Sequence, residues 1–178
     1  MRIISGYAKG RSLQGPKDDS VRPTTDRVRE SLFGILGDFS ECVVVDGFAG
    51  TGALGCEALS RGAEFVYFFD KAPASIEVIE ENLSRLEAAD DAKVIGVPFI
   101  RGLARLEHEP DVVFLDPPYN KGLLLPALEA LGSHPRVTAR ALVVVEQSTK
   151  EPPAEHEAFE LDDERVYGDT RIRFLLRK

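Results

Sequence analysis

Residues 46–55 read DGFAGTGALG, a run of four glycines and two alanines that follows an apolar segment and precedes a helical pattern. Glycines let the backbone pass close to a ligand, and the small Ala49 and Ala53 leave room for a helix to meet a strand. A turn of this composition between a first sheet strand and a helix is typical of cofactor binding. We therefore predict cofactor contacts from this turn, at Asp46, Gly47, Phe48, Ala49, Gly50, Thr51 and Gly52.

Strands and helices are expected to alternate around this turn. Continuous apolar runs, the pattern of strands buried on both faces of a parallel sheet, occur at residues 42–46, 65–70, 93–96, 111–116 and 141–146. Helical patterns fit the segments between them, at residues 53–61, 72–88, 100–106 and 123–131. The alternation predicts an α/β fold with a doubly wound parallel sheet.

The two ends of the chain depart from this alternation. Residues 159–167 and 170–177 are extended candidates separated by Gly168 and Asp169, which predicts a terminal antiparallel hairpin and brings the sheet to seven strands. At the other end, residues 2–6 and 11–13 flank a glycine-containing stretch and predict a small β-hairpin. A helix is expected from Thr24 or Thr25 as its cap to Gly37 as its stop.

Length and composition indicate a single domain. The 178 residues, 43% of them apolar, suffice for one substantial core, so we expect one domain over 1–178, with an extension at 1–37 and a core at 41–178. Two isolated cysteines and three scattered histidines predict no disulfide and no metal site. The absence of a long apolar run, at the start or elsewhere, predicts a cytoplasmic protein that does not enter a membrane.

Charge is unevenly distributed along the chain. The net charge of −8 argues against nonspecific coating of nucleic acid, whose affinity comes mostly from Lys and Arg. Residues 1–29, however, carry seven Lys or Arg against three Asp, a net +4, while the rest carries −12. Charge alone does not decide whether this basic N-terminal segment binds phosphates or is an ordinary solvated surface.

Glycine spacing alone does not identify the cofactor. Gly50-x-Gly52-x-x-Gly55 formally satisfies the dinucleotide fingerprint, whereas no Lys-Ser or Lys-Thr follows to make a phosphate-binding P-loop. Asp70 ends the second strand, twenty-four residues after Asp46, where a carboxylate accepts hydrogen bonds from ribose hydroxyls. A nucleoside-type methyl donor and NAD would both use such a group, and a helix cap is the simpler alternative for Asp70.

The tetrapeptide Asp116-Pro117-Pro118-Tyr119 favours amine chemistry. It directly follows the apolar run 111–115, at a carboxyl strand end where open α/β sheets bind ligands. Two prolines stiffen the backbone and leave carbonyls without local donors. Asp116 and the Pro117 carbonyl would then accept both hydrogens of a flat amino group, with Tyr119 stacked on the base. We predict these four residues as the catalytic set, although a stiff turn is the bland alternative.

These residues together resemble the class I, Rossmann-like methyltransferases. A closer likeness covers the chain essentially end to end: residues 2–6 (RIISG), 10–11 (GR), 22–33 (RPTTDRVRESLF) and 58–63 (ALSRGA) are similar to the RsmD-type bacterial ribosomal RNA guanine-N2 methyltransferases. Two positions depart from the family pattern. Gly34 stands where Asn is usual, and Val97-Pro98-Phe99 stands where an acidic or amide residue often meets adenine.

The resemblance implies methylation of a guanine amino group in small-subunit (16S) ribosomal RNA, with S-adenosyl-L-methionine as donor. It implies ribosomal RNA or a small-subunit assembly intermediate as the partner, and catalytic roles for Asp116 and Tyr119. We expect the protein to act as a monomer. Further donor contacts are expected at Asp70, Lys71, Phe99, Thr24 and Arg27. Phosphate contacts are expected from the basic N-terminal segment, at Arg2, Lys9, Arg11, Arg22 and Arg29.

Three alternatives stay open from the sequence. The same chemistry could act on another RNA or DNA base or on a protein amide, although no separate target-recognition region is visible. A nicotinamide-dependent oxidoreductase would explain the glycines but leaves residues 116–119 without a role. A donor-binding assembly factor without catalytic activity would need neither Asp116 nor Tyr119.

Overall fold

The computed structural model describes residues 1–15 and 26–178. Three predicted residues, the phosphate contact Arg22, the donor contact Thr24 and the helix-cap candidate Thr25, lie outside the described residues.

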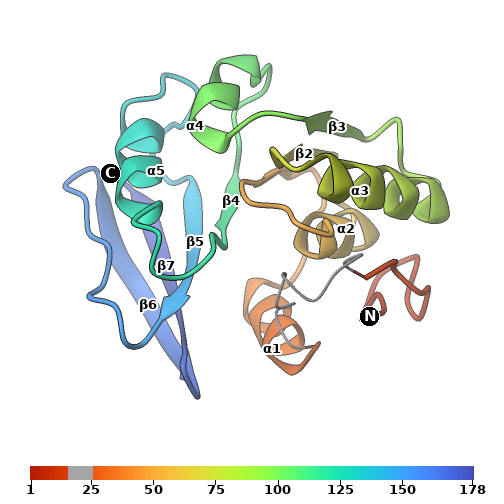
Figure 1. The fold of residues 1–178 in the computed structure, drawn as a ribbon, viewed down its shortest axis with the longest axis horizontal. Coiled ribbons are helices and arrows are strands. Elements are labelled where there is room, and N and C mark those ends of the chain that lie inside the picture. The colour runs from red at the N-terminus through yellow and green to blue at the C-terminus, as the bar shows by residue number, and fades with distance from the viewer. Residues whose placement is uncertain (16–25) are drawn as a thin grey trace.

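The core is a seven-stranded mixed sheet with the order β3-β2-β1-β4-β5-β7-β6 (Figure 1). Strands β1 to β5 run parallel, β7 is antiparallel to β5, and β6 is antiparallel to β7. This confirms the predicted Rossmann-like sheet and its terminal hairpin. The strands are β1 Val43–Asp46, β2 Phe65–Phe69, β3 Ala92–Ile95, β4 Val112–Leu115, β5 Leu142–Ser148, β6 Phe159–Tyr167 and β7 Thr170–Arg177.

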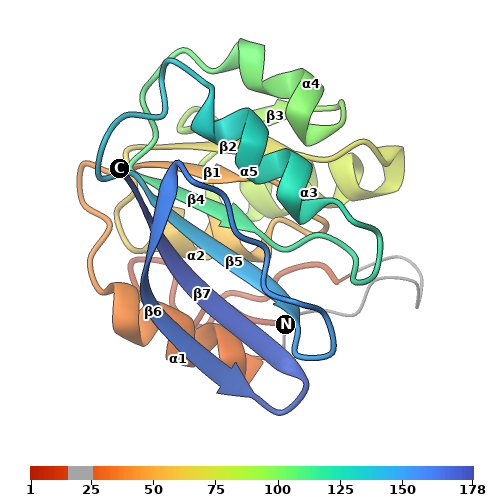
Figure 2. The ribbon, with the colours of Figure 1, turned by 90° about the vertical axis from the view of Figure 1, so that its left-hand side faces the viewer.

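Helices cover both faces of the sheet, as Figure 2 shows for α4 and α5 on one side and α1 on the other. One buried cluster joins the sheet to α1, α2 and α3, and the second joins it to α4 and α5. The expected helix at 100–106 is instead a four-residue α-helix followed by the 3₁₀ turn η1. The helices are α1 Asp26–Leu36, α2 Ala53–Ser60, α3 Pro73–Leu86, α4 Phe99–Gly102, η1 Leu103–Arg105 and α5 Leu124–Gly132.

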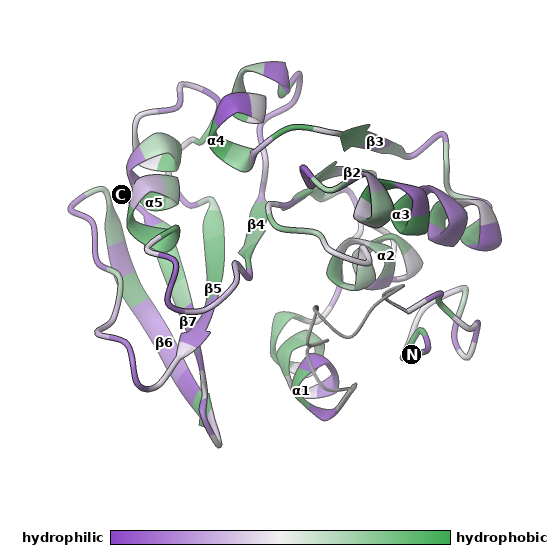
Figure 3. Ribbon diagram, in the orientation of Figure 1, coloured by the Kyte–Doolittle hydropathy of each residue, from purple (hydrophilic) through white to green (hydrophobic). Residues whose placement is uncertain are grey.

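Burial on both faces explains the apolar sequences of the central strands. Val44 packs toward the α1–α3 side and Val45 toward the α4–α5 side, and all four residues of β4 are buried. The edge strand β6 is mostly polar, as its colouring in Figure 3 shows, and most of its residues are exposed. Polar residues on an edge strand discourage pairing with a second sheet.

The glycine-rich turn packs α2 closely onto β2. A Cβ atom at Gly55 would lie 2.2 Å from Cε1 of Phe68, so a side chain at this position would displace the ring. Gly52, at the helix start, has a φ of 75°, a conformation that costs side-chain-bearing residues energy. These two glycines therefore serve the packing of strand, turn and helix whatever the cofactor.

The expected N-terminal β-hairpin forms over a short stretch. Arg2 and Ser12 form an isolated antiparallel bridge, and the N–H groups of Ile3 and Leu13 donate to the carbonyls of Arg11 and Met1, each at 3.0 Å. The pairing ends at Ile4, because the N–H groups of Ile4 and Ser5 donate to the Glu57 carboxylate of α2 at 2.8 and 3.0 Å. Because those groups bond to the helix, they are not available for a strand ladder.

Within the described part of the chain, no helix combines the length and the apolar character needed to cross a membrane.

Candidate active site

The candidate site lies where the strand order reverses, between the neighbouring strands β1 and β4. Helices connect to opposite faces of the sheet on either side of such a point, which opens a crevice at the carboxyl strand ends. Asp46 is the last residue of β1, and Asp116 directly follows β4. Both line a cavity of about 580 Å³, large enough for a nucleoside-sized ligand.

The cavity brings together most of the predicted donor and catalytic residues. Of those sets, it is lined by Asp46, Gly47, Phe48, Ala49, Gly50, Thr51, Asp70, Lys71, Phe99, Asp116, Pro117, Pro118 and Tyr119. Neither Gly52, which is buried, nor Arg27, an exposed residue of α1, lines the cavity.

Two carboxylates hold the glycine-rich turn in place. Asp70 accepts hydrogen bonds from the N–H groups of Gly50 at 2.9 Å and Ala72 at 2.8 Å, so it joins the turn to the start of α3. Asp46 accepts one from Gly55 N–H at 3.0 Å. Asp70 can therefore cap α3 and also bind ribose hydroxyls, because a carboxylate has further lone pairs for hydroxyl donors.

Aromatic rings form the side of the cavity beyond the turn. Phe99 is only 3% exposed, and its ring meets that of Phe69 edge to face at 5.4 Å and lies 5.6 Å from that of Phe48. An apolar wall opposite an acidic group suits a nucleoside, whose base is flat and whose ribose carries hydroxyl donors.

Burial changes the protonation of Asp46. Desolvation of the fully buried carboxyl raises its pKa from 3.8 to about 7, with the negative charge of Asp70 adding to the effect and the Gly55 N–H opposing it. The native state therefore keeps a proton that the unfolded chain releases near pH 4. Stability from this proton is complete below pH 4 and is lost as the pH rises to about 7.

Replacement of Asp46 by Asn should remove this pH dependence. We expect the unfolding free energy of the wild type, minus that of Asp46→Asn, to fall between pH 4 and 7 and to level off above. The slope cannot exceed about 1.4 kcal/mol per pH unit for one proton. Urea unfolding of the donor-free proteins across this range measures it, with the exposed Asp90→Asn as control. A pH-independent difference would contradict the prediction.

Tyr119 is anchored by its hydroxyl group. The hydroxyl donates to Oε1 of Glu146 at 2.9 Å and lies 3.3 Å from Oγ1 of Thr170, so residues of β5 and β7 fix the ring. Burial, together with the charges of Glu146 and Asp116, raises the pKa of Tyr119 well above its ordinary value. The phenol is therefore a neutral donor throughout the physiological pH range.

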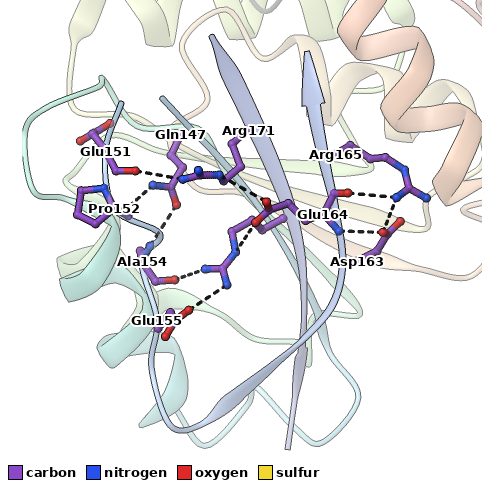
Figure 4. Close-up of polar contacts among 10 residues, drawn as sticks. Gln147, Glu151, Pro152, Ala154, Glu155, Asp163, Glu164, Arg165 and Arg171 are labelled. Carbon is purple, nitrogen blue, oxygen red and sulfur yellow. Dashed lines mark hydrogen bonds and ion pairs between the residues drawn. The ribbon is translucent and has the colours of Figure 1, made fainter. Parts of the chain in front are cut away.

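The loop after β5 is hydrogen-bonded to β5 and β7, the two strands that carry Glu146 and Thr170. Gln147 donates to the Pro152 carbonyl at 3.0 Å and accepts from Ala154 N–H, while Arg171 donates to the Glu151 carbonyl (Figure 4). A second hollow of about 380 Å³ lies between this loop and the 117–119 wall, and Tyr119 and Glu146 line both hollows.

Comparison with known proteins identifies the family. A family model described as "Conserved hypothetical protein 95" matches residues 1–176. The "Ribosomal RNA small subunit methyltransferase D" of Haemophilus influenzae is 37% identical over 179 residues, which cover 97% of this chain and 92% of the relative. Its Escherichia coli K12 namesake is 35% identical over 180 residues, covering 100% and 90%. The chain belongs to the RsmD family.

Structural similarity agrees with the membership. The Escherichia coli protein yhhF superposes on this RsmD-family chain with a TM-score of 0.87 at 33% identity, covering 100% of this chain and 98% of its own. The fold of the described residues therefore has a counterpart in a solved relative.

One predicted RNA contact of the RsmD-family chain is wrong. Arg29 is 0% exposed and donates to the carbonyl of Arg2, because it lies on the inner face of α1, one turn before the buried Phe33. A phosphate contact requires an exposed cation, so Arg29 does not supply one. Arg2, Lys9 and Arg11 are exposed, although Arg11 also donates to the Arg85 carbonyl and lies 3.4 Å from Glu87.

Several cavity residues of the RsmD-family chain were missed from the sequence. Glu146 could have been found, since it ends an apolar run whose strand neighbours that of Asp116. Thr170 depends on the register of β7 against β5, which no local pattern reveals. The remaining missed residues of the lining are Met1, Val28, Arg29, Ala53, Leu54, Phe69, Ala72, Ser75, Pro98 and Leu123.

Proposed function

We propose that this protein transfers a methyl group from S-adenosyl-L-methionine to the exocyclic N2 amine of a guanine in small-subunit ribosomal RNA. The observation that carries the proposal is the position of Asp116 to Tyr119 on the wall of the nucleoside-sized cavity. Membership of a family whose curated relatives are named ribosomal RNA small subunit methyltransferase D supports the choice of RNA as the acceptor.

The cavity residues fit the proposed donor. Asp70 would accept hydrogen bonds from the ribose hydroxyls, and the rings of Phe48 and Phe99 would lie against adenine. Asp46 and the backbone of the glycine-rich turn would hold the amino-acid end. When bound, S-adenosyl-L-methionine supplies a methyl group on a sulfonium, which is a strong electrophile.

Asp116 and Tyr119 would orient the acceptor. A base amine is a weak nucleophile because its lone pair is delocalised into the ring. Two acceptors, the Asp116 carboxylate and the Pro117 carbonyl, would hold its hydrogens so that the lone pair localises on nitrogen. Stacking on the anchored Tyr119 ring would contribute ~1–3 kcal/mol if it resembles other base–aromatic contacts. Correct placement then supplies much of the rate acceleration.

Charge compensation would complete the step. Positive charge develops on the nitrogen as the methyl group transfers, and the Asp116 carboxylate would stabilise it. The proton leaves to water afterwards. Asp116 is therefore an acceptor and an electrostatic partner, and no conventional general base is required.

Exposed cations near the N-terminus would contact RNA phosphates. We expect the double variant Lys9→Ala and Arg11→Ala to bind RNA more weakly, with the slope of log affinity against log salt reduced by about 0.7 per lost contact. Fluorescence anisotropy with labelled ribosomal RNA measures this, and isothermal titration should show unchanged donor affinity. Lys178→Ala is the matched control. An unchanged salt slope would place the RNA elsewhere.

Transfer of a labelled methyl group tests the proposal directly. Naked ribosomal RNA, small subunits and assembled particles are each incubated with labelled donor. The modified nucleoside is then identified by mass spectrometry. We expect N2-methylguanosine in small-subunit RNA. A methylated adenine, cytosine or protein amide would refute the assigned acceptor, and binding of NAD without binding of the donor would refute the assigned cofactor.

A further inference from the structure

Glu146 lies beside the proposed acceptor site. Strands β4 and β5 pair in parallel, with Leu115 opposite Val145, so the next residues, Asp116 and Glu146, are neighbours. Asp116 directly follows β4, while Glu146 lies two residues before the end of β5. Both line the same cavity, and Glu146 is half-buried there. A second carboxylate therefore stands next to the one assigned to the amine.

We propose that Glu146 selects guanine by accepting a hydrogen bond from its N1–H group while Asp116 holds the N2 amine. This inference rests on the proposed function and deepens it. In guanine, the amine-bearing carbon lies between two ring nitrogens, of which N1 carries a proton and N3 a lone pair. In adenine and cytosine, the ring nitrogen next to the amine-bearing carbon carries a lone pair. A carboxylate in this position attracts guanine and repels the other two bases.

The structure holds Glu146 in one place. Its Oε1 accepts the Tyr119 hydroxyl at 2.9 Å, so the group that stacks on the base and the group that would read its edge are joined. A carboxylate has about four lone-pair positions, which leaves capacity for a second donor. The neutral state of the Tyr119 phenol keeps this hydrogen bond directed to Glu146.

Gln147, the residue after Glu146, holds this part of β5 to the loop that follows it. Successive side chains of a strand point to opposite faces, so Gln147 is directed away from Glu146. Gln147 is buried and bonded to both Pro152 and Ala154 of the loop, as Figure 4 shows. On its other side, β5 pairs with β7, where Ile172 lies opposite Glu146. The backbone that carries Glu146 is therefore tied on both sides.

Discrimination is expected to be large because the acceptor is charged. Hydrogen bonds to charged groups contribute more than neutral ones, and a lone pair facing a carboxylate leaves both groups without their partner. We expect guanine to be preferred over an otherwise similar base without N1–H by roughly 10- to 100-fold in kcat/KM.

2-Aminopurine is the base that tests this step. It carries the same N2 amine as guanine, but its N1 is a lone-pair acceptor. Synthetic RNA with guanosine or 2-aminopurine riboside at the mapped target position is methylated by the wild type and by Glu146→Gln. The amide can donate to a lone pair, so the preference for guanosine should fall at least about 10-fold in the variant. The exposed Glu160→Gln should keep the wild-type preference.

The outcomes separate the two proposals. If the wild type forms no N2-methylguanosine, the proposed function fails, and this inference with it. If it forms N2-methylguanosine but Glu146→Gln keeps the wild-type preference, only the role of Glu146 is refuted. The wild type alone supplies a second readout that needs no variant to fold: equal kcat/KM for guanosine and 2-aminopurine RNA would overturn the assignment.

Discussion

Replacement of Asp116 by Ala is expected to lower kcat for methyl transfer by at least about 100-fold, the effect of removing one preorganised electrostatic partner of a developing charge. The donor affinity should stay within about twofold, because Asp116 is assigned to the acceptor while Asp46, Asp70 and Phe99 are assigned to the donor. Single-turnover transfer from labelled donor to small-subunit RNA measures the rate, and isothermal titration measures donor binding.

A matched control separates this effect from a general loss of charge. Asp90→Ala removes an exposed carboxylate between α3 and β3 that does not line the cavity, and should leave both quantities unchanged. Wild-type transfer rates in Asp116→Ala would remove the residue from the mechanism. An equal loss of transfer and of donor binding would assign Asp116 to the donor.

Replacement of Glu57 by Ala is expected to destabilise the fold by about 3 kcal/mol or more. The buried carboxylate accepts from the N–H groups of Ile4 and Ser5 and forms an ion pair with Arg61 at 2.9 Å. Its removal leaves a largely buried cation and two backbone donors without their acceptor, each of which is costly. For a chain of this size the melting temperature should fall by roughly 10 °C.

Urea and thermal unfolding measure this loss. Glu80→Ala, an exposed position on α3, is the control and should change stability by less than about 0.5 kcal/mol. A Glu57→Ala protein with wild-type stability would show that the N-terminal segment is held by its apolar residues, such as Ile3 and Leu13, and not by the carboxylate.

Elements that depend only on the local sequence pattern agree with the prediction, and elements that depend on distant contacts differ from it. The boundaries of β6 and β7 agree with the predicted 159–167 and 170–177, because a polar turn separates two long extended runs. The N-terminal hairpin pairs only around Arg2 and Ser12, because the N–H groups of Ile4, Ser5 and Ala8 bond to Glu57 and Ser60 of α2. A helix that is distant in the sequence shortens this hairpin, and local pattern does not report such competition.

In the candidate site, too, some residues could be placed from the sequence and others could not. Asp46, Asp70 and Asp116 each end a strand, and parallel strands bring their carboxyl ends to one edge, so the sequence predicts that these residues gather there. Arg29 shows the limit. Charge placed it among the RNA contacts, but the direction of a helix face decides whether a cation is exposed, and Arg29 faces inward.

The sequence by itself determined the α/β class, the glycine-rich turn and the order of acidic strand ends, because each rests on residues close together in the chain and on a simple periodicity. Only the tertiary structure decided that Tyr119 is anchored to Glu146 and Thr170, and that Glu57 holds the N-terminal segment. These contacts join residues 27 to 53 positions apart. They depend on strand order, register and helix packing. These features are set by the free energy of packing the whole core, which no short stretch of sequence determines.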